Sequence, residues 1–158
     1  MEQINLEVRS DNSRAIALYK KFGFRKLCTF PGFSVNVDMP LEALDKEQIR
    51  SFILPGGNIS DIDTPEVKAY LQALMKREIL IAEICAGVDV LDHAGILCDV
   101  ISTHSSDADL VTDKNVITAR ANAYVDFAVE VAKKLDLFAS EDDLQETINF
   151  WKHYQRVQ

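Results

Sequence analysis

Apolar residues recur along this chain with two spacings, and the succession of the two predicts strands interleaved with helices. Runs of strand type cover residues 4–8, 24–30, 33–38, 51–54, 79–84, 98–102, 110–112 and 116–118. Stripes at helical spacing cover residues 15–22, 67–74, 88–94, 121–135 and 144–151, with a short helical turn at 41–45. Because a strand, a helix and a further strand form a βαβ unit, the middle of the chain predicts a parallel sheet.

Two of the helix starts are marked by capping residues. Thr64 stands before Pro65 and Glu66, which is an N-cap followed by residue types favoured in the first turn. Ser140 stands before three acidic residues, which also favours a helix N-terminus. This last helix carries an apolar stripe that could cover either the chain's own core or a partner's: Leu144, Ile148 and Trp151.

The stretch 80–87 organises the rest of the chain. An apolar strand with one charge stops at Cys85, and the small residues Ala86 and Gly87 lead into the next helix. A strand that turns sharply into a helix at one reactive side chain has the geometry of a nucleophile elbow. The positive end of the helix would favour the thiolate form of that cysteine. The alternative is a buried structural cysteine that ends a core strand, and this stretch alone leaves both interpretations open.

Glu83 is the one charge within this strand. It lies two residues before Cys85, so a regular strand would place both side chains on the same side. It could act beside the cysteine, where a neutral acid would stabilise thiolate and an ionised one would oppose it. The interpretation that we prefer is an ion pair with a nearby Lys or Arg at an exposed strand, because a buried carboxylate is costly without a partner.

The carboxyl ends of the two central strands are expected to meet. Gly56 and Gly57 follow the strand 51–54, and Cys85 follows the strand 79–84. Ligands bind beyond the carboxyl ends of such strands, so Gly57 and Cys85 could line one crevice. Two glycines also let backbone N–H groups face a developing anion, although a plain turn explains the pair equally well.

Composition narrows the class of protein. The chain has 158 residues and a net charge of -8, which argues against nucleic acid and anionic membranes as partners. Three cysteines form no disulfide framework, and no apolar run approaches the length of a membrane span, so we expect a cytoplasmic protein. Cys28 and Cys98 lie in predicted strands and are expected in the core, whereas His93 and His153 are expected at the surface. No spacing of His, Cys and acidic residues predicts a metal site, and no cofactor is expected.

Residues 4–26 resemble the C-terminal motif of the GNAT N-acetyltransferases. The resemblance rests on Leu6-Glu7-Val8-Arg9, Asn12, Ala15-Ile16, Leu18-Tyr19 and Gly23-Phe24. It implies that Tyr19 occupies the position of a general acid toward coenzyme A. The family's pyrophosphate-binding loop lies upstream of this motif and has no counterpart here, so we do not expect acetyl-CoA to bind.

A longer resemblance covers residues 33–137. The segments that carry it are Leu54-Pro55-Gly56-Gly57, Ala82 to Gly87, Ala94 to Leu97, Thr103-His104 and Asp113 to Ala119. They are similar, in order and spacing, to the ThiJ/PfpI family of class I glutamine amidotransferase-like proteins. The resemblance implies an α/β fold, a flavodoxin-like three-layer sandwich with a mostly parallel sheet and a cysteine nucleophile elbow at Cys85. It also implies an oxyanion site formed by the amides of Gly57 and Ala86.

The activities ascribed to this family are intracellular protease or amidase, glyoxalase or deglycase, chaperone and oxidative-stress sensor. The resemblance therefore implies a small-molecule substrate with a carbonyl or amide group, and a homodimer. The catalytic set that we predict is Cys85, His104 and Glu83. Lowering the pKa of a thiol by two units takes about 2.7 kcal/mol. A helix N-terminus supplies roughly 0.3–2 kcal/mol, so a charged imidazole such as His104 is needed nearby. The alternative for His104 is a histidine in a surface loop.

The chain departs from the family in two places. PfpI-type proteases carry His directly after the cysteine, where this chain has Ala86. Family members also open with a strand and helix that bring a glutamate onto the cysteine, and here the acetyltransferase-like segment 1–30 stands in that place. The sequence thus predicts two parts: 1–30, packed on or completing the main sheet, and a ThiJ/PfpI-like domain at 31–158 with a C-terminal helix. A protein that senses stress through oxidation of Cys85, and an inactive scaffold, are the alternatives to an enzyme.

Overall fold

Four strands form one mixed sheet in the computed structural model, which describes residues 41–43, 45 and 47–156. The strands are β1 (Ser51–Leu54), β2 (Leu80–Ile84), β3 (Leu110–Asp113) and β4 (Val116–Ala119), and their order in the sheet is β1-β2-β4-β3. β1 and β4 pair parallel to β2, and β3 pairs antiparallel to β4. The predicted parallel core and the hairpin that closes it are therefore confirmed.

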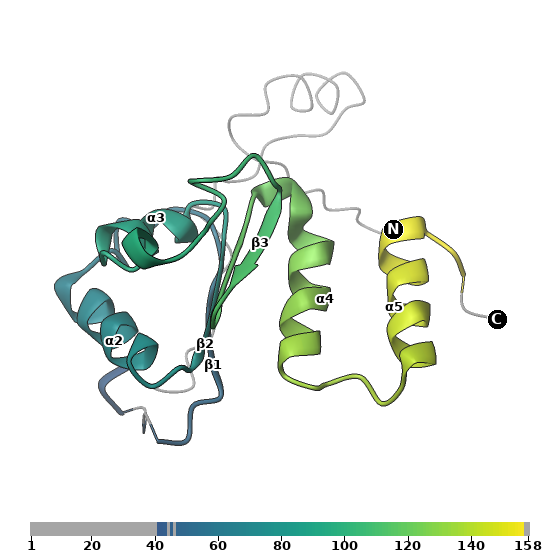
Figure 1. The fold of residues 1–158 in the computed structure, drawn as a ribbon, viewed down its shortest axis with the longest axis horizontal. Coiled ribbons are helices and arrows are strands. Elements are labelled where there is room, and N and C mark those ends of the chain that lie inside the picture. The colour runs from purple at the N-terminus through teal and green to yellow at the C-terminus, as the bar shows by residue number, and fades with distance from the viewer. Residues whose placement is uncertain (1–40, 44, 46, 157–158) are drawn as a thin grey trace, which may run out of the picture. The chain divides into compact units, whose positions relative to one another are not determined.

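Helices cover both faces of the sheet (Figure 1). The helices α2 (Pro65–Met75) and α3 (Gly87–His93) pack against β2 on one face, and α4 (Tyr124–Lys134) packs against β2 and β4 on the other. The final helix α5 (Glu141–His153) packs on α4, outside this sandwich. Short 3-10 turns complete the described part: η1 (Leu41–Ala43), η2 (Leu97–Asp99) and η3 (Ala121–Ala123). This is the flavodoxin-like α/β arrangement that the sequence predicted.

Strand β2 carries two different faces. Ala82 belongs to a buried cluster with Ile117, Phe127 and Val131, so it faces α4. Because side chains alternate along a strand, Ile81 and Glu83 face the layer of α2 and α3. That layer contributes fully buried apolar side chains: Leu71, Leu74, Val88, Val90 and Leu91. Glu83 is therefore a carboxyl group inside an apolar layer.

The capping residues act as the sequence predicted. The side chain of Thr64 accepts a hydrogen bond from the backbone N–H of Val67 at 3.3 Å, and Pro65 is the first residue of α2. The side chain of Ser140 accepts one from the N–H of Asp143 at 3.2 Å. Each bond satisfies a backbone donor that the first turn of a helix leaves unpaired.

The predicted strand at 98–102 is wrong. Residues Leu97–Asp99 form the turn η2, and Cys98 is exposed rather than part of the core. Val100 and Ser102 are buried while Ile101 is exposed, which reproduces the burial pattern of a strand. The N–H of Ile101 donates to the Asp113 side chain at 2.7 Å, so this segment is tied down by a side chain rather than by a neighbouring strand.

The apolar stripe of α5 is only partly used by the chain itself. Leu144 is buried, Ile148 is half-buried, and Trp151 is 60% exposed beside Phe150, with the two rings 5.1 Å apart. No helix in the described part of the chain is long and apolar enough to cross a membrane. A compact unit begins at Ala43 and runs to Gln158, while the predicted division at residue 30, the acetyltransferase-like segment and Cys28 lie outside the described residues.

Candidate functional site

Cys85 lies where the chain turns from β2 into α3. Its φ is 59°, a left-handed conformation that residues other than glycine rarely adopt. Its N–H donates to the carbonyl of Ala119 at 2.8 Å, and its own carbonyl accepts from Val88 at 3.2 Å, so the strained turn is held from both sides. The residue is exposed, which rules out the alternative of a buried structural cysteine.

Two glycines allow the loop after β1 to lie against this turn. A Cβ atom on Gly56 would stand 2.5 Å from the Cβ of Cys85 and 3.2 Å from its Sγ. A Cβ atom on Gly87 would stand 2.7 Å from the carbonyl oxygen of Leu54. Sequence reasoning singled out Gly57, which has a φ of 136° but no atom within 4 Å of its Cβ position. The sequence indicated Gly56 and Gly87 as residues of the two turns, but it did not predict that both pack this closely.

The predicted oxyanion donors are free of partners within the described part of the chain. Neither the N–H of Gly57 nor that of Ala86 donates to a described acceptor. Ala86 is the N-cap position of α3, so its amide lies at the positive end of that helix. The helix has only seven residues and carries Asp89 in its first turn, which offsets part of that positive potential.

Glu83 is buried, and it has no hydrogen-bond partner among the described residues. Its side chain is 0% exposed, and neither carboxyl oxygen bonds to a described donor or acceptor. Burial raises its pKa to about 9, so the group is a neutral acid at pH 7. The preferred interpretation from sequence, an ion pair with Lys or Arg, is therefore wrong, since no such pair to Glu83 exists among the described residues.

His104 is held by α3. Its Nε2 lies 3.3 Å from Oδ1 of Asp89, and its Nδ1 lies 3.8 Å from Oδ2 of Asp92. Its backbone N–H donates to the Ser102 side chain at 3.2 Å, and the neighbouring Thr103 N–H donates to the buried Thr118 hydroxyl at 3.0 Å. Both ring nitrogens thus face carboxylates, and no hydrogen bond joins His104 to Cys85 within the described residues. The structure brings His104 to the helix that follows the cysteine, not to the thiol itself.

The remaining candidates lie apart from this turn. His93 pairs with Asp63 at 2.9 Å and is half-exposed, and His153 is exposed, as expected for both. Among the described residues, no group of three His, Cys, Asp or Glu side chains is arranged to hold a metal ion. Cys98 is a second exposed thiol, on η2.

Known proteins resemble this chain in both sequence and fold. The sequence profile of the DJ-1/PfpI family matches residues 21–134. A relative named "Uncharacterized protease YoaZ", from Bacillus subtilis (strain 168), is 30% identical over 152 residues, covering 84% of this chain and 70% of the relative.

Solved structures agree with that match. The DJ-1 superfamily protein Atu0886 from Agrobacterium tumefaciens is 28% identical, with a TM-score of 0.61 over 72% of this chain and 70% of its own. DJ-1beta from Drosophila melanogaster shares the fold at 23% identity, with a TM-score of 0.54 over 66% of this chain and 64% of its own. The acetyltransferase resemblance of residues 4–26 finds no support in these comparisons, and the family match already begins at residue 21. The chain belongs to the DJ-1/PfpI family.

Proposed function

We propose that this protein carries out cysteine-dependent chemistry on a small carbonyl or amide compound, as a hydrolase or a glyoxalase or deglycase type of enzyme. The observation that carries the proposal is the strained, exposed Cys85 between β2 and α3. A residue held at positive φ is costly, and such strain concentrates at functional sites. The close packing of Gly56 on Cys85, and the lack of a described acceptor for the Gly57 and Ala86 amides, support assigning those amides as oxyanion donors.

The chemistry requires four events for an amide substrate. The Cys85 thiol passes its proton to His104, and the resulting thiolate adds to the carbonyl carbon. The carbonyl oxygen becomes an oxyanion, whose stabilisation we assign to the Gly57 and Ala86 amides. The intermediate collapses, the C–N bond breaks, and the amine leaves with a proton that we assign to His104. Water then hydrolyses the thioester and restores the thiol. His104 must release Asp89 or act through a water to take part, because its ring nitrogens face α3.

A second candidate function is a response to oxidants through Cys85. The observation that favours it is the engagement of His104 with Asp89 and Asp92, which leaves the thiol without a described base. An exposed thiolate oxidises to a sulfenic acid and then to a sulfinic acid. In that case the protein would consume peroxide in proportion to its own amount and would not turn over.

Alkylation and turnover together test both candidates. We expect iodoacetamide to label Cys85 faster than Cys98 at pH 7, read by mass spectrometry, because both thiols are exposed but only Cys85 sits at the strained turn. Methylglyoxal consumption that is lost in Cys85→Ser and kept in Cys98→Ser would support the enzyme. Stoichiometric oxidation by peroxide without turnover would support the sensor, and equal labelling of the two thiols would count against both.

A further inference from the structure

The proposed function leaves unexplained why an acid lies in the apolar layer beneath Cys85. Glu83 pairs in register with Leu54 of β1 and with Thr118 of β4, so it occupies the middle of the sheet. The Thr118 hydroxyl already accepts a hydrogen bond from Thr103. Both oxygens of Glu83 are buried and make no hydrogen bond within the part of the chain that the structure describes. A polar group in this position opposes folding, so some other requirement has to account for it.

Glu83 lies directly below the first turn of α3. A Cβ atom on Gly87 would stand 3.6 Å from the Cβ of Glu83, which is ordinary van der Waals contact. Gly87 is the first residue of α3, and Val88, Val90 and Leu91 of that helix are fully buried against the same layer. The first residue of α3 therefore lies close to the Cβ of Glu83, at the point where the backbone leaves Cys85.

Nothing charged in the described part of the chain compensates for an ionised Glu83. The titratable side chains on the covering elements are Lys68, Tyr70 and the exposed Glu66 on α2, Asp89, Asp92 and His93 on α3, and His104 on the following loop. Asp89, Asp92, His93 and His104 are partly exposed and pair with one another or with Asp63, and Lys68 pairs with Asp63. Burial is the cause of the raised pKa of Glu83, and no opposite charge lowers it.

We propose that Glu83 is a positioning residue controlled by its own proton, and we call this device the latch. The neutral carboxyl keeps the first turn of α3 packed on β2. Loss of the proton moves that turn away from β2, so that the backbone of Cys85 is no longer held in its conformation. The proposal rests on the proposed function, since it concerns the regulation of the same thiol. On ionisation the proton passes to water, and that water must enter between β2 and α3, because a buried carboxylate without a partner has to be solvated. Gly87, in the first turn of α3, lies over the Cβ of Glu83.

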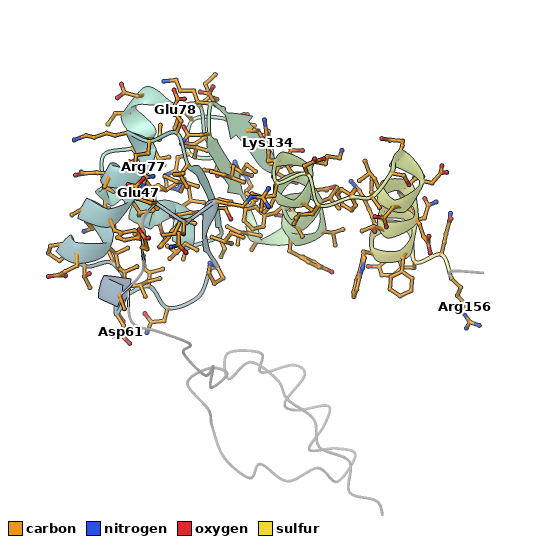
Figure 2. All side chains as sticks on the ribbon, turned by 90° about the horizontal axis from the view of Figure 1, so that it is seen from below. Glu47, Asp61, Arg77, Glu78, Lys134 and Arg156 are labelled. Carbon is orange, nitrogen blue, oxygen red and sulfur yellow. The ribbon has the colours of Figure 1, made fainter. Side chains whose placement is uncertain are left out.

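Hydrogen exchange tests the latch without using the thiol. The wild type, Glu83→Gln and the control Glu78→Gln are compared at equal pH between 7 and 10. Glu78 is exposed in the turn between α2 and β2 (Figure 2), so its variant makes the same change of charge at the surface. We expect the backbone amides of Val88 to Leu91 to lose protection in the wild type and in Glu78→Gln as the pH passes about 9, and to keep it in Glu83→Gln. Equal exchange in all three proteins would overturn the latch.

Alkylation shows whether the latch reaches Cys85. We expect the ratio of labelling rates of Cys85 and Cys98 to move toward one above pH 9 in the wild type and to stay constant in Glu83→Gln. If the two labelling rates are already equal at pH 7, the proposed function of Cys85 is refuted. The latch is still tested in that case, because hydrogen exchange does not depend on the reactivity of the thiol. If Glu83→Gln loses its circular dichroism signal at pH 7, Glu83→Leu replaces it, because a well-packed apolar side chain leaves no buried group unsatisfied. Parallel loss of protection in that variant would also overturn the proposal.

Discussion

Replacing Glu83 should change how the stability of this protein depends on pH. The carboxyl has an ordinary pKa of 4.5 when exposed, and burial raises the value to about 9 in the folded chain. Between these values the group is neutral when folded and ionised when unfolded, so unfolding releases a proton. The free energy of unfolding therefore falls as pH rises through this window. Below pH 4.5 the group is neutral in both states, and Glu83 gives stability no dependence on pH.

The size of the effect follows from the width of the window. Each pH unit changes the free energy of unfolding by about 1.4 kcal/mol, because the folded state binds one more proton than the unfolded state. From pH 5.5 to 7.5 the wild type should lose about 2.7 kcal/mol through this one group. Glu83→Gln cannot titrate and should lose none of it. The difference is large against the roughly 5–15 kcal/mol that holds a typical domain together.

Urea denaturation at pH 5.5, 6.5 and 7.5 measures this difference. The slopes of stability against pH for the wild type and for Glu83→Gln should diverge, while Glu78→Gln should follow the wild type because Glu78 is exposed. Parallel slopes for the wild type and Glu83→Gln would refute the reasoning, since they would mean that Glu83 is ionised in the folded protein and solvated or paired there.

Three further predictions concern neighbouring features. Gly56→Ala should destabilise the fold by roughly 1–3 kcal/mol and slow the alkylation of Cys85, because the added methyl would lie 2.5 Å from the Cys85 Cβ. The control Gly57→Ala places its methyl near no atom, so it should destabilise the fold only through backbone strain. Asp89→Asn should remove the closer of the two carboxylates that face the His104 ring and change the free energy of unfolding by about 1 kcal/mol or less, as expected for a half-exposed pair. Two-dimensional NMR of the imidazole would report the change, and an unchanged ring environment would contradict the pairing. The homodimer expected from the sequence should be visible by sedimentation velocity, and if α5 forms its interface, the fluorescence of the exposed Trp151 should shift to shorter wavelength with protein concentration.

Local signals in the sequence predicted most of the fold. The N-caps at Thr64 and Ser140 and the strands on either side of α2 are set by neighbouring residues, and the structure has them where the pattern placed them. The segment 98–102 shows where that reasoning fails. Its alternation of buried and exposed residues is real, but a strand also needs a backbone partner, and the Asp113 side chain takes the hydrogen bond instead.

The site was harder to predict because its contacts join distant parts of the chain. The sharp turn at Cys85 follows from the small residues that come after it, so the sequence could indicate it. Whether Glu83 forms an ion pair depends on which elements pack over β2, and neither α2 nor α3 places a Lys or Arg side chain against it. In the same way, His104 lies against α3, and its ring pairs with the Asp89 carboxylate. Each of these outcomes depends on packing between segments rather than on local spacing.

The backbone conformation of Cys85 has a consequence for how the sequence can drift. A left-handed conformation costs a residue with a Cβ roughly 1–2 kcal/mol, and glycine escapes this strain at an entropic cost of about 0.5–1 kcal/mol. Glycine at position 85 should therefore fold at least as well as cysteine. A library randomised at this position and selected only for folded protein would then lose the thiol, whereas a library selected for the biological activity would keep it. The composition recovered at a single codon would separate what this chain needs in order to fold from what it needs in order to work.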